Sequence, residues 1–290
     1  MRSEAFAKIN LYLDVMERRA DGFHNIRSIM HRVTLSDFIT VSEVLGKKGS
    51  ITVNCGGAPL PTGEENLVWK AAKRFFDYTK ISDYSISINI EKHIPISACL
   101  AGGSADAAAT LTALNEIFGT QLTNNELCDL GATIGSDVPF CISGRTSLAE
   151  ERGEILTDIE SELDIIFVIA KGGDGVSTPK AYGRIDEKFG DTLCEEFGNI
   201  SGMLEAIGNG DVNEICACLY NTFEDVVLPI HKEASTAREI MLKNGAMAAM
   251  LSGSGPSVFG IFDNEEHAHS VCKILTELGY ESYVCKSLKT

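Results

Sequence analysis

The chain has no long hydrophobic run, and no apolar stretch approaches the roughly 18 residues that a membrane-spanning helix needs. Its first residues include Arg2 and Glu4 and do not resemble a secretion signal. Nine cysteines are present without a CxxC pair, and the six histidines form no HExxH pattern, so zinc and other protein-bound metals are not expected. These absences predict a cytoplasmic protein with reduced thiols and no membrane contact.

Positive charge is also scarce, because 25 lysines and arginines face 41 acidic residues and leave a net charge of −16. Such a chain repels nucleic acid, which is therefore not an expected partner. An anionic small-molecule substrate then requires positive charge to be concentrated locally, and residues 1–32 hold six basic side chains against four acidic ones. A hydrophobic content of 44% indicates a globular protein, long enough at 290 residues for one large domain or two modest ones.

Apolar periodicity predicts a mixed chain of the α+β class. Alternation and short apolar runs predict strands at residues 5–15, 37–44, 85–91, 165–170, 246–251, 258–262 and 280–285. Helical spacing predicts helices at residues 65–79, 104–118, 123–133 and 265–278. The order of strand, turn, strand, helix and strand after residue 246 indicates an antiparallel sheet. We place the domain boundary near residue 155, which gives segments 1–155 and 156–290.

Residues 92–108, KHIPISACLAGGSADAA, run from an apolar segment through small residues into an alanine-rich helix. The first N–H groups of a helix have no internal partner and lie at the positive end of its dipole, so this helix start suits a phosphate. Small side chains let the phosphate approach the backbone. The other reading is a surface turn capped by Ser104, with Asp106 placed to suit the dipole. Neither a Walker loop nor a dinucleotide fingerprint is present, because both spacings are missing.

Two segments near the start of the chain carry side chains suited to chemistry, and each also has a structural reading. Lys8 lies in an apolar strand, where a charge is costly unless it is paired or used, although an edge strand would leave it exposed. Asp21-Gly22 predicts a turn that presents Phe23 and His24 side by side. The aromatic ring suits stacking on a flat heterocycle, and the imidazole suits hydrogen bonding to its edge. The other reading is a hairpin turn with a half-buried phenylalanine.

Two later segments are equally open. Asp137 in GSDVPF (135–140) is either the N-cap of a short turn or a carboxylate that accepts a hydroxyl proton during phosphoryl transfer. The glycine-rich segment MLSGSGPSVFG (250–260) is either a hairpin turn or a place where backbone amides approach a phosphate or a neighbouring loop. Taken singly, neither segment decides between its two readings.

In order and spacing, AKIN, ADGFH, the loop from IP to GGS, GSDVPF, AEERGE (149–154) and SGSGPSVFG resemble the motifs of the GHMP kinase superfamily. The match covers nearly the whole chain, and ADGFH and AEERGE resemble the branch whose substrate carries a cytidine diphosphate. The resemblance implies an N-terminal ATP-binding domain like domain 2 of ribosomal protein S5 and a ferredoxin-like C-terminal domain on the substrate side. It implies an ATP-dependent kinase that phosphorylates the 2-hydroxyl of 4-diphosphocytidyl-2-C-methyl-D-erythritol in non-mevalonate isoprenoid biosynthesis.

The resemblance also implies a catalytic pair and a nucleotide site. Asp137 would orient and deprotonate the hydroxyl, and Lys8 would stabilise the charge that develops during transfer. ATP and Mg²⁺ are the implied cofactors, and the implied partner is a small molecule bound by a monomer or weak homodimer. The positions that match residues near ATP are Asn66, Lys92, Pro95, Ile96, Ser97, Ala98, Cys99, Leu100, Ala101, Gly102, Gly103, Ser104 and Ala105.

Four further residues match the substrate side of the family. The match assigns His24 to the edge of the cytosine and Phe23 to one of its faces. Tyr182, in STPKAY (177–182), falls at the position of the aromatic residue on the other face. Asn10 matches a substrate-side asparagine after the catalytic lysine.

Two other functions compete with this one, namely another small-alcohol kinase of the superfamily and a nucleotide-binding relative with weak or no phosphoryl transfer. ADGFH argues against the first, because the other members have no cytosine to bind. The second is favoured by the loop, where the family pattern P-x-G-x-G-L-G-G-G-S-S has glycine in place of Ser97, Cys99 and Ala101. Ala105 replaces the second serine and removes one hydroxyl. Small side chains permit a phosphate to approach but disfavour left-handed backbone.

We expect the altered loop to weaken ATP binding while the fold is kept. The double substitution Cys99→Gly and Ala101→Gly should bind ATP more tightly than the wild type in titration calorimetry, because glycine adopts left-handed conformations without steric cost. An unchanged affinity would contradict this expectation.

Overall fold

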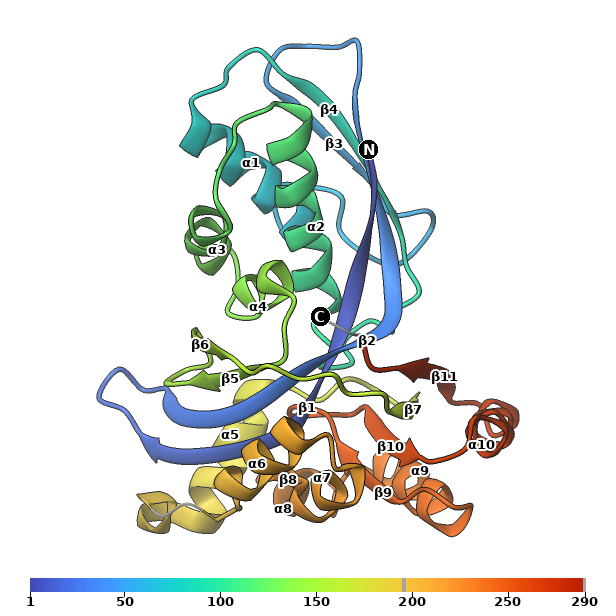
Figure 1. Cartoon of the computed structure of the whole chain (residues 1–290). Coiled ribbons are helices and arrows are strands. Elements are labelled where there is room, and N and C mark those ends of the chain that lie inside the picture. The colour runs from blue at the N-terminus through green and yellow to red at the C-terminus, as the bar shows by residue number, and fades with distance from the viewer. Residues whose placement is uncertain (195–196, 289–290) are drawn as a thin grey trace. The chain divides into compact units, whose positions relative to one another are not determined.

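The computed structural model of the protein describes residues 1–194 and 197–288. Figure 1 shows its elements, which in chain order are β1 (Arg2–Arg18), β2 (His24–Glu43), β3 (Ser50–Asn54), α1 (Leu67–Thr79), β4 (Ser85–Glu91), α2 (Gly102–Ile117), α3 (Asn124–Ala132), α4 (Val138–Ser143), β5 (Ser147–Glu150), β6 (Ile155–Asp158), β7 (Ile166–Lys171), α5 (Thr178–Phe189), a 3-10 helix (Gly190–Cys194), α6 (Ile200–Asn209), α7 (Val212–Cys218), β8 (Tyr220–Asn221), α8 (Glu224–Val227), α9 (Lys232–Lys243), β9 (Ala248–Leu251), β10 (Val258–Phe262), α10 (Glu265–Glu277) and β11 (Glu281–Lys286). Among the helices that these residues form, none combines the length and apolar character that a membrane crossing requires.

The chain folds into two compact units that are not consecutive in sequence. Unit 1 consists of Met1–Ala7, Ser36–Ile94 and Ala101–Gly144, and unit 2 consists of Lys8–Leu35, Pro95–Leu100 and the chain from Arg145 onward. Strands β1 and β2 therefore contribute residues to both units. The predicted boundary near residue 155 is a single cut in the sequence, whereas each compact unit consists of several segments. The boundary therefore stays a prediction.

The strands of unit 1 have one well-buried face. Ile86, Ile88 and Ile90 of β4 are buried, while the residues between them are more exposed, as expected for a sheet covered on one side. Strand β3 runs parallel to β4, and residues 38–43 of β2 run antiparallel to β4 along its other edge. The predicted strand at 85–91 is confirmed, whereas β2 begins far earlier than the predicted 37–44.

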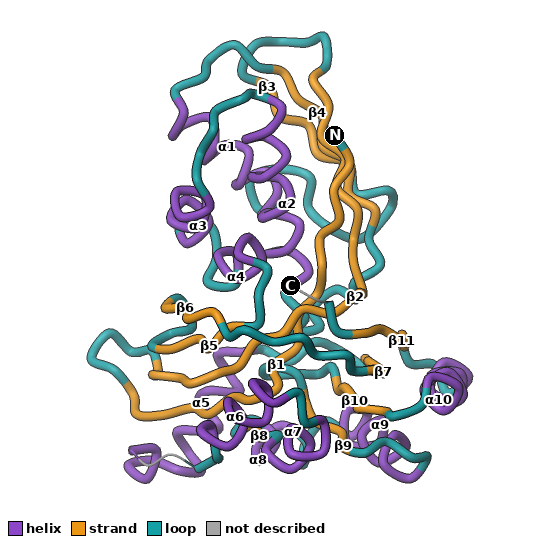
Figure 2. Tube along the Cα trace, in the orientation of Figure 1, coloured by secondary structure: helices purple, strands orange, loops and turns teal. Residues whose placement is uncertain are grey.

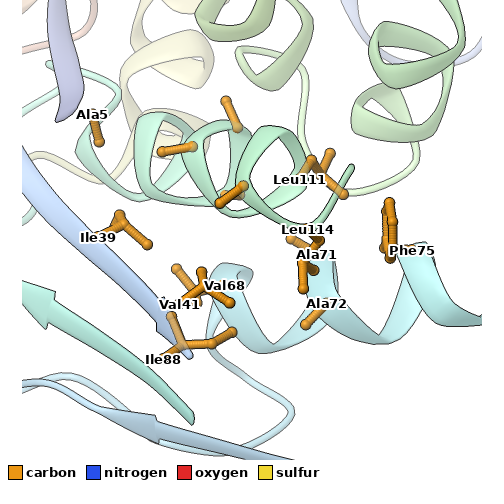
Figure 3. Packing of buried hydrophobic residues seen from close by; sticks show 14 of the residues in the cluster. Ala5, Ile39, Val41, Val68, Ala71, Ala72, Phe75, Ile88, Leu111 and Leu114 are labelled. Carbon is orange, nitrogen blue, oxygen red and sulfur yellow. The ribbon is translucent and has the colours of Figure 1, made fainter. Parts of the chain in front are cut away.

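Helices α1 and α2 lie side by side in unit 1 and form its core with the sheet (Figures 1 and 2). Alanines on α2 let the two helices approach closely, and Figure 3 shows Phe75 of α1 near Leu111 and Leu114 of α2. The helix predicted at residues 65–79 is confirmed as α1, and its buried residues recur at intervals of three and four. They are Val68, Ala71, Ala72, Phe75 and Phe76.

The antiparallel sheet predicted for the second half of the chain is confirmed in unit 2. Its strand order is β11-β7-β10-β9, and every neighbouring pair is antiparallel. Helices α9 and α10 share a core with Val168 and Ala170 of β7. The alternate residue Phe167 contacts Phe259 and His31 by its ring, as expected for a strand whose side chains alternate between two buried faces.

We expect Phe75→Ala to lower the free energy of unfolding by about 3–5 kcal/mol, because the side chain is fully buried and its removal leaves a cavity between α1 and α2. The matched control is Tyr78→Ala on the same helix, where the ring is 50% exposed and the expected loss is much smaller. Urea unfolding of both variants measures the difference. Equal losses would mean that α1 is not packed as the structure shows.

Candidate active site

The small-residue loop, residues 95–101, completes the connection from β4 to α2 and follows an unusual backbone path. Ser97, Cys99 and Ala101 adopt left-handed conformations with φ of 55°, 53° and 56°. These are the three positions at which the resemblance expects glycine, and left-handed backbone costs a non-glycine residue about 1–2 kcal/mol. The chain therefore keeps the path of a glycine loop without those glycines.

Ser97 and Cys99 fit because glycines face them within unit 2. A Cβ on Gly175 would lie 2.8 Å from the Cβ of Ser97, and a Cβ on Gly253 would lie 3.2 Å from the Cβ of Cys99. The thiol of Cys99 also lies 3.3 Å from the hydroxyl of Ser254. The glycine-rich turn that contains Gly253 is therefore a packing neighbour of the small-residue loop and more than a hairpin.

Helix α2 begins at Gly102 rather than at the predicted residue 104. Its N-cap, Ala101, has no polar side chain, and the N–H groups of the first turn lack intrahelical partners. Ser104 lies inside the helix, so the reading of this segment as a turn capped by Ser104 is wrong. A Cβ on Gly102 would lie 3.2 Å from the Nζ of Lys92 and 3.1 Å from the Cγ2 of Ile94, so glycine lets these side chains approach the helix start.

Lys8 is buried in β1, with 6% of its surface exposed, and its reading as an exposed edge lysine is wrong. Its ammonium donates to the Oδ1 of Asn10 at 2.8 Å, and the amide nitrogen of Asn10 donates to the hydroxyl of Ser28 at 2.8 Å. That hydroxyl donates to the carbonyl of Tyr12 at 2.7 Å. The backbone N–H of Lys8 donates to the carbonyl of Leu100 at 3.1 Å. A buried, hydrogen-bonded cation thus lies on the strand that holds the small-residue loop.

A second cluster of unit 2 surrounds His24 at the start of β2. Its imidazole stacks on the ring of Tyr182, with the centroids 5.1 Å apart and 14° between the planes. Its Nε2 lies 2.8 Å from the Oδ1 of Asp186, four residues after Tyr182 on α5. The guanidinium of Arg18 lies 3.8 Å from the other carboxylate oxygen of Asp186. The structure therefore brings together His24 and Tyr182, which lie far apart in the sequence.

Phe23 differs from its neighbour His24, because 57% of its surface is exposed. The predicted turn is confirmed, with Gly22 at a φ of 87° and the N–H of Phe23 donating to the Oδ1 of Asp21 at 3.1 Å. The guanidinium of Arg152 lies 5.2 Å from the centroid of the Phe23 ring. The role of Phe23 in stacking on a base stays a prediction.

In unit 1, Lys92 is held between two buried carboxylates. Its ammonium donates to the Oδ2 of Asp37 and, at 3.0 Å, to the Oδ2 of Asp106 on α2. The other oxygen of Asp37 accepts the N–H groups of His93 at 2.6 Å and Ile94 at 2.8 Å. Asp37 therefore fixes the backbone at the entrance to the small-residue loop as well as the Lys92 side chain.

The cluster of Lys92, Asp37 and Asp106 holds two acidic groups and one basic group, and this imbalance affects the pKa of Asp106. Burial raises the pKa of the Asp106 carboxyl, Lys92 opposes that rise and Asp37 adds to it, with a result of about 7. The Oδ1 of Asp106 has no hydrogen-bond partner in the described part of the chain. For Lys92, burial opposes the charged form but the two carboxylates outweigh it, and the pKa is raised.

The remaining predicted residues of unit 1 lie at helix starts. Asn66 is the N-cap of α1: its Oδ1 accepts the N–H of Val68 at 2.8 Å, and its amide nitrogen donates to the carbonyl of Pro61 at 2.7 Å. Asp137 is the N-cap residue of α4, but its side chain accepts no capping hydrogen bond from that helix, all of which the structure describes. The capping reading of Asp137 therefore lacks its hydrogen bond, and its catalytic role stays a prediction.

Comparison with known proteins agrees with these motifs. The GHMP kinases N terminal domain matches residues 66–145, and the GHMP kinases C terminal domain matches residues 203–281. A 4-diphosphocytidyl-2-C-methyl-D-erythritol kinase of Clostridium novyi is 40% identical over 260 residues, which cover 90% of each chain. One of Exiguobacterium sibiricum is 39% identical over 288 residues, which cover 98% of this chain and 97% of the other. The chain belongs to the 4-diphosphocytidyl-2-C-methyl-D-erythritol kinase family of the GHMP kinases.

Solved structures show the same architecture. A crystal structure of 4-(cytidine 5'-diphospho)-2C-methyl-D-erythritol kinase matches with a TM-score of 0.82 and 29% identity, covering 99% of this chain and 98% of the other. Homoserine kinase from Cytophaga hutchinsonii matches with a TM-score of 0.78 and 19% identity, covering 99% and 94%, and this likeness concerns the fold alone. The predicted GHMP kinase fold of the α+β class is confirmed.

The sequence motifs did not single out two residues that the structure places at these clusters. Asp37 lies 55 positions from Lys92 and Asp186 lies 162 positions from His24, and neither belongs to a motif. A helical reading of residues 178–189 would have placed Asp186 on the same helix face as Tyr182, because residues four apart are neighbours on a helix. Asp106 was noticed only as a residue that suits the helix dipole.

The raised pKa of Asp106 predicts a pH dependence of stability. The carboxyl binds its proton more tightly in the folded state, so its stabilising contribution is present below pH 4 and lost as the pH rises through about 7. Asp106→Asn keeps the shape and removes the titration. We expect the free energy of unfolding of the variant, relative to wild type, to rise by roughly 1–3 kcal/mol between pH 5 and 8 in urea titrations. A constant difference between the two proteins would contradict the assignment.

Proposed function

We propose that this GHMP kinase transfers the γ-phosphoryl group of ATP to the 2-hydroxyl of 4-diphosphocytidyl-2-C-methyl-D-erythritol. The observation that carries the proposal is a buried ammonium, that of Lys8, whose hydrogen-bond partner lies at the left-handed loop. The Oδ1 of Asn10, which accepts from Lys8, and the Cβ of Cys99 lie 3.4 Å and 3.2 Å from the position that a Cβ on Gly253 would take. An ammonium beside such a loop suits the oxygens of a transferring phosphoryl group. The acceptor comes from the names of relatives at 39–40% identity.

The proposed step is an in-line displacement. The hydroxyl oxygen forms a bond to the γ-phosphorus, the bond from that phosphorus to the bridging oxygen of the β-phosphate breaks, and ADP leaves. The hydroxyl proton passes to the carboxylate of Asp137, and the ammonium of Lys8 stabilises the negative charge on the reacting oxygens. Asn10 supports Lys8 by fixing its ammonium through a 2.8 Å hydrogen bond. Lys8 and Asp137 belong to different units, and their joint action is part of the proposal.

ATP is proposed to bind as its magnesium complex along the small-residue loop. Ala98 and Leu100 of that loop and Ala105 of α2 are buried, and the N–H of Ala105 donates to the carbonyl of Ala101. A phosphate would therefore bind to the N–H groups of the first turn of α2, which precede Ala105. In the described residues no group of three or more His, Cys, Asp or Glu side chains is arranged to hold a metal. Mg²⁺ generally keeps several waters and takes substrate phosphates with one or two carboxylates, which fits an ion that arrives with ATP.

The cytidine end of the substrate is proposed to bind at His24, Phe23 and Tyr182. The stacking of Tyr182 on His24 supports this, because aromatic faces and a ring nitrogen are the groups that bind a base. We place the enzyme in the cytoplasm, and the support is that the cysteines whose side chains the structure describes are free thiols, as in a reducing compartment.

The test is an ADP-release assay with ATP, magnesium and the cytidyl-diphospho-methylerythritol substrate. Asp137→Asn should lower kcat by roughly 10²–10⁴-fold, the usual contribution of a positioned acid–base group, with KM little changed. The matched control is Asp129→Asn, the same substitution at an exposed site of α3 in the same unit, and it should leave kcat unchanged.

Near-normal turnover of Asp137→Asn would remove Asp137 from the mechanism. Turnover by the wild type only with a different alcohol would make the protein another small-alcohol kinase. Binding of ATP without turnover would favour a nucleotide-binding relative, for which the left-handed backbone at Ser97, Cys99 and Ala101 is the supporting feature.

A further inference from the structure

His24 is constrained in two independent ways by one helix. Tyr182 and Asp186 lie four residues apart on α5 and so on the same face of that helix. The Tyr182 ring stacks on the face of the imidazole at 5.1 Å and fixes its plane. The Asp186 carboxylate at 2.8 Å from Nε2 fixes which edge of the ring is turned toward α5. The imidazole therefore has one defined orientation.

The partner of Nε2 also determines where the ring carries its proton. An ionised carboxylate only accepts hydrogen bonds, so the 2.8 Å contact requires a hydrogen on Nε2. A neutral imidazole has a single N–H, and in this orientation its Nδ1 holds a lone pair and acts as an acceptor. Among the described residues Nδ1 has no hydrogen-bond partner, and although His24 as a whole is only 5% exposed, Nδ1 is not one of the fully enclosed unpartnered side-chain atoms. Between them, Tyr182 and Asp186 leave the Nδ1 edge of the ring for a ligand.

We propose that Asp186 is a positioning residue that holds His24 in the tautomer with an unprotonated Nδ1, and so makes the site accept cytosine and reject uracil. The inference rests on the proposed function, since it assigns the base of that substrate to His24. Cytosine carries an exocyclic amino group at C4, which donates a hydrogen bond, whereas a pyrimidine with a C4 carbonyl, such as thymine or uracil, carries an acceptor there. The Nδ1 lone pair can accept a hydrogen bond from the amino group of cytosine, whereas it is repelled by the carbonyl oxygen of uracil.

Histidine alone does not give this selectivity. An imidazole with the hydrogen on Nδ1 would donate to the carbonyl of uracil, so the preference depends on which nitrogen is protonated. The guanidinium of Arg18 forms an ion pair with the other oxygen of Asp186 at 3.8 Å. The two oxygens of the carboxylate therefore have different partners, an imidazole N–H at one and a guanidinium at the other.

The first measurement is the tautomer itself, by ¹⁵N NMR of histidine-labelled protein at a pH of about 8.5, where an ordinary imidazole is neutral. The signal of His24, assigned with a His24→Gln variant, should show hydrogen on Nε2 only. Asp186→Asn should give a mixture of tautomers, because an amide both donates and accepts. A wild-type signal from the Nδ1–H tautomer or from the imidazolium would overturn the proposal.

The second measurement is the preference for cytidine diphosphate over uridine diphosphate, by calorimetric titration with the ATP site saturated by a nonhydrolysable ATP analogue. The wild type should prefer cytidine diphosphate, and Asp186→Asn should reduce that preference by about 3- to 10-fold, the worth of one hydrogen bond. Asp186→Glu, which keeps the carboxylate, should retain most of the preference. Glu187→Gln changes the net charge by the same amount at the next residue, which is exposed. It should leave the preference unchanged.

The outcomes separate this inference from the proposed function. If the wild type binds neither diphosphate, the proposed cytidyl substrate and the inference both fail. If the wild type prefers cytidine diphosphate and Asp186→Asn keeps the same preference, only the inference fails. Equal weakening of both ligands in Asp186→Asn also overturns it, because that is the effect of a merely structural role.

Discussion

The hydrogen bond from the N–H of Lys8 to the carbonyl of Leu100 connects the small-residue loop to β1. A loop with left-handed backbone at Ser97, Cys99 and Ala101 costs several kcal/mol relative to glycine, at about 1–2 kcal/mol for each residue. Fixed packing offsets that cost, because the loop lies against glycines on other segments of unit 2 and is held by the strand. The Lys8 side chain is oriented separately, by the hydrogen bond from its ammonium to the Oδ1 of Asn10.

Lys8, which is buried, and Lys92, which is half-buried, have different partners. Lys8 is bonded to the amide oxygen of Asn10, whereas Lys92 lies between the carboxylates of Asp37 and Asp106. Two carboxylates more than neutralise one ammonium, so the cluster of Lys92 offers a phosphate little net positive charge. Asp37 instead binds two backbone N–H groups at the entrance to the loop, which makes this cluster a means of fixing geometry.

The orientation of the His24 side chain likewise depends on residues that are distant in the sequence. An aromatic ring and a carboxylate on one face of α5 fix both the plane and the hydrogen bonding of a single imidazole. The position of α5 relative to the start of β2 therefore determines what the histidine can donate or accept. A motif that contains the histidine but not its carboxylate describes only part of this arrangement.

The sequence by itself determined the elements whose signals are local. The strand at 85–91 follows from alternation, α1 follows from helical spacing, and the start of α3 was expected near residue 123. The order of motifs likewise determined the family and brought His24 and Tyr182 into one hypothesis.

Tertiary structure decided the contacts between distant side chains that no pair of motifs links. The pairs of Asp37 with Lys92 and of Asp186 with His24 join residues 55 and 162 positions apart, and no local pattern encodes such a contact. Left-handed backbone at Ser97 and Cys99 contradicts their intrinsic preference, and the opposing glycines leave room for the side chains that this backbone presents. The burial of Lys8 was equally undecided until its neighbours were in place. Local interactions fix the elements, while the energetic cost of strain and of buried charge is met by contacts that exist only in the folded chain.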